Sequence, residues 1–291
     1  MGRVRDAVPM DVRHEIARNR IRLRVPTGRF RVLPDALVIG AQRAGTSSLY
    51  RWLGSHPDVA PSLRKEVEYF SRRPAAGERW YRAHFRLALP WAGSRLAFEA
   101  TPDYLFHPLA ASRAAATVPD ARLVALLRDP VARAWSHHGH MVRLGYETLG
   151  FDEALDAEDG RCAADLARID DPSHDPKQLL RFSYRARGRY AEQLERWFAH
   201  FPRDRVLVVW SDDLFAEPSR AYRRVLAFLD LRDRPPASFD NVSARPPARD
   251  PAPTLAPTTR AALEADYRAD DDRLADLLGT IPPWRATTPA S

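Results

Sequence analysis

The chain has 291 residues, of which 45% are hydrophobic and 29% charged, and its formal net charge is +7. The apolar fraction can fill a substantial core, which excludes wholesale disorder, and the length allows one large domain or two small ones. No apolar run approaches the roughly 18 residues that a membrane-spanning helix needs. The basic start lacks the apolar stretch of a secretory signal, so we expect a cytoplasmic protein.

Arginine dominates the positive charge, because 43 of the 45 basic residues are Arg and only Lys65 and Lys177 are lysine. A guanidinium group binds phosphate and carboxylate bidentately, so this composition favours an anionic ligand. A genomic bias toward Ala, Arg, Asp and Pro would produce the same composition. Nucleic acid, an anionic cofactor and an acidic substrate therefore all stay open at this point. The one cysteine, Cys162, excludes an internal disulfide and a cysteine-cluster metal site.

Apolar runs and helical spacing predict an α/β domain. Residues 1–34 are predicted to be a basic N-terminal extension, with a short helix over residues 10–25, and residues 35–291 a single domain. The predicted elements, in chain order, are a strand at Ala36–Ile39, a helix from Leu49 to His56, a strand at Arg122–Leu127, a helix at Val131–Leu144, a helix at Tyr190–Phe201, a strand at Arg205–Trp210 and a helix near Ser219–Leu229. Strands that alternate with helices predict a central parallel sheet covered on both faces, a three-layer α/β/α domain.

A glycine-containing loop follows the first predicted strand and reads GAQRAGTSS over residues 40–48. Its two glycines and the helix start after it can turn backbone N–H groups toward an anion. The loop nearly fits the phosphate-loop template GxxxxGK[ST], but Thr46 occupies the lysine position and the basic residue is Arg43. Thr46, Ser47 and Ser48 add hydroxyl groups that can cap the helix or bind phosphate. A capped helix without a ligand is the alternative interpretation.

A second candidate anion site follows the second predicted strand. Arg128 stands at the strand end, and Ser136 lies two turns into the next helix, so the two can reach one phosphate from two sides. A turn salt bridge between Arg128 and Asp129 is the alternative. The two segments together, in this order, are more specific than either alone.

These two segments resemble those of the sulfotransferases that use 3′-phosphoadenosine 5′-phosphosulfate (PAPS). The family's loop typically reads GxxKxGTTSL, and this chain reads GAQRAGTSSL over residues 40–49, with Arg43 at the position of the usual lysine. The resemblance implies the P-loop NTPase-like sulfotransferase fold, PAPS as the sulfuryl donor, PAP as the product, and no metal. The implied ligands of the 5′-phosphosulfate are Gln42, Arg43, Ala44, Gly45, Thr46, Ser47 and Ser48, and those of the 3′-phosphate are Arg128 and Ser136.

A further resemblance concerns the acid–base residue, since sulfuryl transfer needs a base that takes the acceptor's proton. The segment KEVEYF at residues 65–70 is similar to a Lys-Glu-x-x-[FY]-Phe segment of the heparan-sulfate branch and of similar bacterial sulfotransferases, in which the Glu is the base. This resemblance implies Glu66 as the catalytic base, with Arg43 assisting the leaving phosphate. Glu68 is the second candidate, because on an extended segment it would share a face with Glu66. A surface charge run is the alternative interpretation.

Other patterns carry weaker expectations. The heparan branch often has a catalytic lysine where this chain has Ala100, so that assistance is either absent or supplied by another residue, such as Lys65 or an arginine. Arg245 is a candidate for the family's basic loop over the donor. The histidines at positions 137, 138 and 140 lack a third ligand at metal spacing, so we expect a structural or acceptor-facing role. The acidic run at residues 270–272 predicts a solvated helix face.

We therefore expect in-line transfer of a sulfuryl group from PAPS to a hydroxyl or amine of a small-molecule, lipid or carbohydrate acceptor, with no nucleic acid partner. One alternative is a nucleotide phosphotransferase or kinase, because the loop is close to the Walker A pattern. That activity would need lysine in place of Thr46. The other alternative is a basic nucleic-acid-binding protein, but no helix-turn-helix, zinc or stacking motif marks a readout surface.

Overall fold

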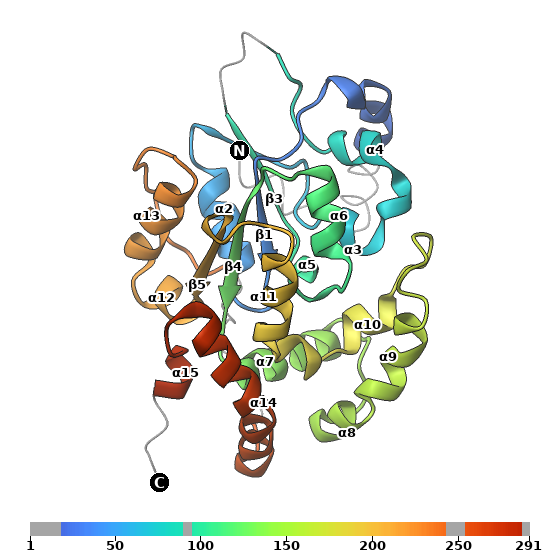
Figure 1. Ribbon diagram of the computed structural model, residues 1–291, viewed down its shortest axis with the longest axis vertical. Coiled ribbons are helices and arrows are strands. Elements are labelled where there is room, and N and C mark those ends of the chain that lie inside the picture. Colours follow the sequence, from blue (N-terminus) through green and yellow to red (C-terminus); the bar gives the residue numbers. More distant parts are fainter. Residues whose placement is uncertain (1–18, 90–94, 243–253, 287–291) are drawn as a thin grey trace.

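Five parallel strands form the sheet of the described chain, in the order β2-β3-β1-β4-β5 (Figure 1). The computed structural model describes residues 19–89, 95–242 and 254–286. The strands are β1 Ala36–Gly40, β2 Val59–Pro61, β3 Leu96–Ala100, β4 Arg122–Leu127 and β5 Val206–Trp210. The three predicted strands and the parallel sheet are thus confirmed.

Apolar runs in the sequence do not predict two of the strands, β2 and β3. β2 is only three residues long and ends in Pro61, which its position at the edge of the sheet tolerates. β3 reads LAFEA, and Glu99 interrupts its apolar run. This carboxylate is nevertheless completely buried, because hydrogen bonds compensate it inside the protein.

Helices cover both faces of the sheet: Figure 1 shows α2 and α13 on one side and α6 and α11 on the other. The predicted three-layer arrangement is confirmed. The α-helices are α2 Thr46–Gly54, α3 Tyr69–Arg72, α4 Glu78–Arg82, α5 Asp103–Phe106, α6 Ala110–Thr117, α7 Pro130–Arg143, α8 Phe151–Asp156, α9 Glu158–Leu166, α10 Lys177–Phe182, α11 Tyr190–Phe198, α12 Ser211–Ala216, α13 Pro218–Phe228, α14 Pro257–Leu278 and α15 Pro283–Ala286. The 3-10 helices are η1 Val25–Phe30, η2 Pro74–Ala76, η3 Ala186–Gly188 and η4 Arg203–Arg205. Of the helices described, none combines the length and the apolar character needed to cross a membrane.

The central strands lie in the middle of the core. All five residues of β1 are buried, and Leu37 and Leu123 have no exposed surface. Leu49 and Trp52 of α2 are almost completely buried in the same core as these strands. Burying side chains of this kind contributes about 1.5–3 kcal/mol each, so the sheet is a rigid support for the loops at its ends.

The described part of residues 1–34 packs onto the domain. Residues 19–24 are helical, whereas the part of the predicted N-terminal helix before residue 19 lies outside the described residues. Arg31 forms a β-bridge with Leu87, and its side chain donates to the Phe85 carbonyl oxygen at 2.9 Å. The division into an extension and a single domain stays a prediction.

The acidic run in α14 faces inward at two of its three positions. Asp270 accepts a hydrogen bond from the Ala191 N–H at 3.0 Å, where α11 begins, and Asp271 accepts one from Trp284 Nε1 at 3.1 Å. Burial raises the pKa of Asp271 to about 6. The predicted solvated face is therefore wrong for these two residues, because both carboxylates hold neighbouring elements, and right for Asp272, which is exposed.

Candidate active site

A cleft of about 1160 Å³ opens at the carboxyl ends of β1, β4 and β5. This edge of a parallel sheet is where α/β proteins usually bind ligands. The loops after all three strands contribute to the cleft wall. The lining residues are Gln42, Arg43, Gly45, Thr46, Ser47, Lys65, Glu66, Pro102, Arg128, Ala132, Trp135, Ser136, His138, Gly139, His140, Val142, Arg143, Ser211, Asp212, Phe215, Asn241, Val242 and Arg260.

The loop after β1 turns sharply at two residues with a left-handed backbone. Arg43 has a φ of 69°, and Gly45, the N-cap of α2, has a φ of 102°. A Cβ at Gly45 would lie 2.9 Å from Leu214 Cδ2, so glycine suits both the conformation and the space. The loop thereby brings the start of α2, with Thr46 and Ser47, to the cleft wall. The N–H groups of a helix start are a favourable site for an anion.

The two predicted anion-binding segments meet in this cleft. Arg43 Nε donates to Ser136 Oγ at 3.1 Å, and Arg128 Nη1 donates to the Arg43 carbonyl oxygen at 3.2 Å. The Tyr190 hydroxyl donates to the Arg128 carbonyl oxygen at 2.9 Å and so holds the end of β4. Arg43 and Arg128 are 85 positions apart in the sequence. Their guanidinium groups border one cavity, which favours a ligand with anionic groups.

Of the residues predicted to bind PAPS, Ala44 and Ser48 do not line the cleft, and all the other residues do. Both residues are completely buried, and Ser48 Oγ accepts a hydrogen bond from the Val242 N–H at 3.1 Å. Ser48 therefore holds the chain after α13 against α2. Gln42 does line the cleft, and its Oε1 is buried without a hydrogen-bond partner among the described residues. An amide oxygen accepts hydrogen bonds, so it suits a hydrogen-bond donor and not a phosphate oxygen.

Asp129 does not form the turn salt bridge with Arg128 that the sequence left open. Its Oδ1 caps α7 by accepting from the Val131 N–H at 2.9 Å, and its Oδ2 lies 3.5 Å from Arg260 Nη1 on α14. Arg260 also lines the cleft, and no local motif predicts it. Arg245, the candidate for a basic loop over the donor, lies outside the described residues.

Glu66 lies on the cleft wall with its carboxylate beside an ammonium group. Its side chain is 48% exposed, and its Oε1 is 2.5 Å from Lys65 Nζ. The Glu66 N–H donates to the Ala100 carbonyl oxygen at 3.0 Å, and the Glu66 carbonyl oxygen accepts from Arg64 Nε at 3.0 Å. Ala100 stands at a position where the heparan branch often has a lysine. Lys65 brings an ammonium group close to this position, because it contacts Glu66, whose N–H binds the Ala100 carbonyl oxygen.

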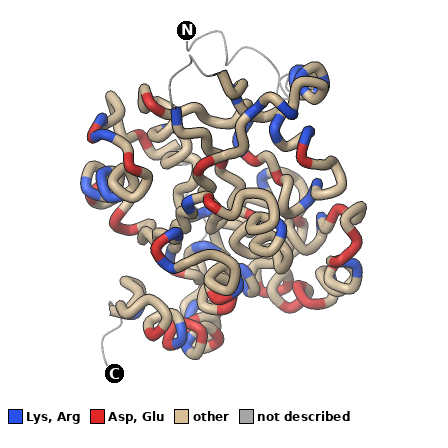
Figure 2. The backbone as a smooth tube through the Cα atoms, turned by 45° about the horizontal axis from the view of Figure 1, so that its top comes forward, with Lys and Arg blue, Asp and Glu red and all other residues tan. Residues whose placement is uncertain are grey.

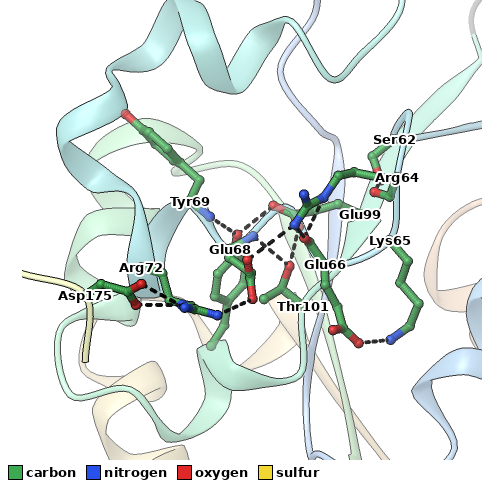
Figure 3. Close-up of polar contacts among 11 residues, drawn as sticks. Ser62, Arg64, Lys65, Glu66, Glu68, Tyr69, Arg72, Glu99, Thr101 and Asp175 are labelled. Carbon is green, nitrogen blue, oxygen red and sulfur yellow. Dashed lines mark hydrogen bonds and ion pairs between the residues drawn. The ribbon is translucent and has the colours of Figure 1, made fainter. Parts of the chain in front are cut away.

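Glu68 does not line the cleft and is held between arginines instead (Figure 3). Its carboxylate lies 3.3 Å from Arg64 Nη2 and 3.1 Å from Arg72 Nη1. Burial raises the pKa of Glu68, and the charges of Arg72 and Arg64 offset part of that rise. Arg72 also binds Asp175 through two hydrogen bonds of 2.7 and 2.8 Å. The segment is not extended, because Glu66 and Glu68 both have a left-handed backbone, with φ of 60° and 62°.

Glu99 supports this segment from inside β3. Its carboxylate accepts hydrogen bonds from the hydroxyl groups of Tyr81 at 2.7 Å, Tyr104 at 3.0 Å and Thr101 at 2.7 Å. Thr101 Oγ1 in turn accepts from the Glu68 N–H at 3.3 Å (Figure 3). Burial raises the pKa of Glu99. No sequence motif assigns a role to Glu99, although an acid inside the apolar run LAFEA is a signal for a buried, compensated carboxylate.

The three neighbouring histidines of α7 differ in their surroundings. His137 is completely buried, and burial lowers its pKa well below the usual value. His138 Nε2 is 3.0 Å from the Leu149 carbonyl oxygen. His140 faces the cleft, where its Nδ1 accepts a hydrogen bond from Arg143 at 2.9 Å. Within residues 19–89, 95–242 and 254–286, no group of three His, Cys, Asp or Glu side chains is placed to hold a metal ion.

The site as a whole can hold an anion at one place and accept a proton at another. The helix start, Arg43 and Arg128 suit phosphate-like groups, and the Glu66 carboxylate can take a proton from a neighbouring group. Elsewhere, basic and acidic residues are interspersed over much of the described backbone (Figure 2), but α13 carries Arg220, Arg223 and Arg224 and no acidic residue.

Comparison with known proteins identifies relatives over most of the chain. The sulfotransferase domain family matches residues 33–250. The bifunctional heparan sulfate N-deacetylase/N-sulfotransferase 1 of Caenorhabditis briggsae is 29% identical over 213 residues, which cover 70% of this chain and 23% of that protein. The heparan sulfate glucosamine 3-O-sulfotransferase 3B1 of Mus musculus is 32% identical over 200 residues, which cover 69% of this chain and 47% of that protein. The alignments thus span less than half the length of these two relatives.

A solved structure shares the fold over nearly its entire length. The crystal structure of a sulfotransferase from Alicyclobacillus acidocaldarius matches with a TM-score of 0.64 and 29% sequence identity. The match covers 86% of this chain and 97% of that one. The architecture described above is therefore similar to that of a bacterial sulfotransferase.

Proposed function

This chain belongs to the sulfotransferase domain family and is a sulfotransferase; on that premise we propose that it uses PAPS as donor and releases PAP. The acceptor would be a hydroxyl or amine of a small-molecule, lipid or carbohydrate compound, and Glu66 would be the general base. The observation that carries the proposal is that the two predicted anion-binding segments meet in one cleft. Arg43 donates a hydrogen bond to Ser136, and Arg128 donates one to the Arg43 carbonyl oxygen.

The donor would lie along the loop after β1 and the start of α7. Arg43, Gly45, Thr46 and Ser47 line the cleft where α2 begins and would hold the 5′-phosphosulfate. Arg128, directly after β4, and Ser136, in α7, would together hold the 3′-phosphate. Ala44 and Ser48 stay weaker candidates, because neither lines the cleft.

The chain's own residues supply proton transfer and charge stabilisation. When bound, PAPS supplies a sulfuryl group whose bond to the 5′-phosphate oxygen breaks as the acceptor bonds to sulfur, with the electron pair staying on that phosphate oxygen. Glu66 takes the acceptor's proton on its carboxylate. Arg43 and the first N–H groups of α2 stabilise the negative charge that grows at the phosphate. Lys65 holds the Glu66 carboxylate at the cleft wall.

The relatives bear on the acceptor only in broad terms. The two curated relatives are named for heparan sulfate, which supports a carbohydrate among the candidate acceptors. Their substrates do not transfer automatically, because this chain covers 23% and 47% of their lengths. The phosphotransferase alternative is less well supported, since Thr46 holds the Walker A lysine position at the start of α2.

Binding and turnover should separate in the Glu66→Gln variant. We expect it to bind PAP as the wild type does in isothermal titration calorimetry, while formation of products heavier by SO₃ falls at least about 100-fold, the range of general base catalysis. Glu78→Gln, at an exposed acid of α4, is the matched control and should keep its activity. Full activity of Glu66→Gln would remove Glu66 as the base.

The donor can be tested without knowing the acceptor. We expect PAP to raise the melting temperature of the wild type without magnesium, and ATP with magnesium to leave it unchanged. The reverse result would favour the phosphotransferase alternative and overturn the assignment of PAPS.

A further inference from the structure

The segment with the proposed base has an unfavourable backbone conformation at two residues. Glu66 and Glu68 have φ values of 60° and 62°, in the left-handed region, and neither is glycine. A residue with a Cβ atom adopts this region at a cost in free energy, so the conformation persists only where surrounding contacts impose it. Glu66 lines the cleft, Glu68 does not, and Val67 between them is completely buried. The contacts that impose this backbone therefore decide where the Glu66 carboxylate lies.

The backbone of Glu66 is held through both its N–H and its carbonyl oxygen. The N–H donates to the Ala100 carbonyl oxygen at the end of β3. The carbonyl oxygen accepts two hydrogen bonds from Arg64, from Nε at 3.0 Å and from Nη2 at 2.5 Å. The first contact joins Glu66 to a strand of the sheet, whereas the second depends on the placement of a long side chain that is 30% exposed. Whatever fixes the Arg64 guanidinium group therefore fixes the carbonyl side of Glu66.

Glu68 fixes this guanidinium group (Figure 3). Its Oε2 lies 3.3 Å from Arg64 Nη2, and no other carboxylate of the described residues lies within ion-pair distance of Arg64. Its Oε1 accepts a hydrogen bond from Arg72 Nη1 at 3.1 Å, and Arg72 in turn binds Asp175 through two hydrogen bonds. Because the Glu68 side chain is only 14% exposed, solvent screens these contacts less than it screens surface ion pairs. A chain of contacts thus runs from Asp175 to the Glu66 carbonyl oxygen.

We propose that Glu68 is a positioning residue: its carboxylate holds Arg64, and Arg64 holds Glu66 with its carboxylate on the cleft wall. This inference rests on the proposed function, in which Glu66 is the base. Glu68 is not placed to take the acceptor's proton itself, because it does not line the cleft and each of its carboxylate oxygens contacts a guanidinium group. A displacement of about 1 Å at a reacting group can lower the rate about 100-fold. A residue that acts only through Glu66 therefore affects turnover and leaves donor binding unchanged.

A double-mutant cycle tests this role, with PAPS as donor and whichever of a heparosan oligosaccharide, 2-naphthol and dodecylamine the wild type sulfates fastest. We expect Glu68→Gln to lower kcat at least about tenfold, with the KM for the acceptor and the PAP affinity in calorimetry unchanged. In a Glu66→Gln background the same substitution should lower kcat by less than about twofold, because the base through which it acts is already missing. Glu158→Gln is the matched control, because this acid is also buried near an arginine, Arg185, and lies outside the cleft; it should keep its kcat.

Crystal structures of the wild type and of Glu68→Gln decide the inference even where none of the three acceptors is sulfated. A glutamine amide has a single oxygen and cannot replace both carboxylate contacts, so we expect Arg64 to leave the Glu66 carbonyl oxygen and the Glu66 carboxylate to move. An unmoved Glu66 in the variant, an equal fall of kcat in both backgrounds, or wild-type kcat in Glu68→Gln would each overturn the positioning role. Full activity of Glu66→Gln would instead remove the base itself, and failure of the wild type to bind PAP would overturn the proposed donor.

Discussion

His107 should make the stability of this protein depend on pH. It follows α5, is 2% exposed, and its Nδ1 accepts a hydrogen bond from the Leu109 N–H at 3.2 Å. Burial, together with the charges of Arg113, Arg187 and Arg196, lowers the pKa of His107 to about 3. The imidazole is therefore neutral in the folded protein at pH 5 and above.

The sign of the effect follows from the unfolded chain, in which the pKa of a histidine is about 6.5. Below that pH the unfolded state binds a proton that the folded state does not bind. The free energy of unfolding is thus retained above pH 6.5 and falls as the pH falls below it. At pH 5 the difference is about 1.5 pH units, which at 1.36 kcal/mol per unit corresponds to about 2 kcal/mol.

Urea denaturation at pH 7.5 and pH 5.0 measures this effect when the wild type is compared with His107→Asn. The asparagine oxygen can accept the same bond from the Leu109 N–H, but it does not titrate. We expect the loss of unfolding free energy between the two pH values to be about 2 kcal/mol smaller in the variant. His200→Asn, at an exposed position, should behave as the wild type. Equal losses in His107→Asn and the wild type would refute the reasoning.

Two further predictions concern the donor site. Arg128→Ala should weaken PAP binding about 10- to 100-fold in calorimetry, because it removes a guanidinium group that faces the cleft, and unchanged affinity would contradict the 3′-phosphate assignment. Gly45→Ala should lower the free energy of unfolding by about 1–3 kcal/mol, since the new Cβ meets Leu214 at 2.9 Å and the φ of 102° is unfavourable for alanine. A wild-type urea midpoint and wild-type PAP affinity in that variant would show that the loop relaxes freely.

The predictable part of the fold is the part with unbroken apolar runs. β4 is continuously hydrophobic after its first residue, Arg122, and β5 is hydrophobic throughout; both strands appear where the sequence pattern puts them. β3 could not be found in this way, because whether Glu99 is buried depends on hydroxyl groups that come from other segments, such as that of Tyr81. β2 is too short to carry a pattern.

The candidate site likewise has a part that the sequence predicts and a part that it does not. Arg43, Arg128 and Glu66 belong to local motifs, and the structure brings all three to one cleft. The left-handed backbone at Glu66 could not be predicted, because residue type favours that conformation only for Gly and, more weakly, for Asn and Asp. Arg260 reaches the cleft only because α14 packs near the start of α7, a contact between segments 131 positions apart.

Arg43 is anchored through both its carbonyl oxygen and its guanidinium group. Much of the rotational freedom of this long side chain, about 2 kcal/mol, is therefore lost when the chain folds and not when a ligand arrives. A ligand that meets donors already in place does not have to order this part of the loop. We therefore expect the association rate of PAP to follow diffusion and charge steering, rising as the ionic strength falls, without a slow conformational step. PAP would therefore bind in a single step to a surface that is already ordered.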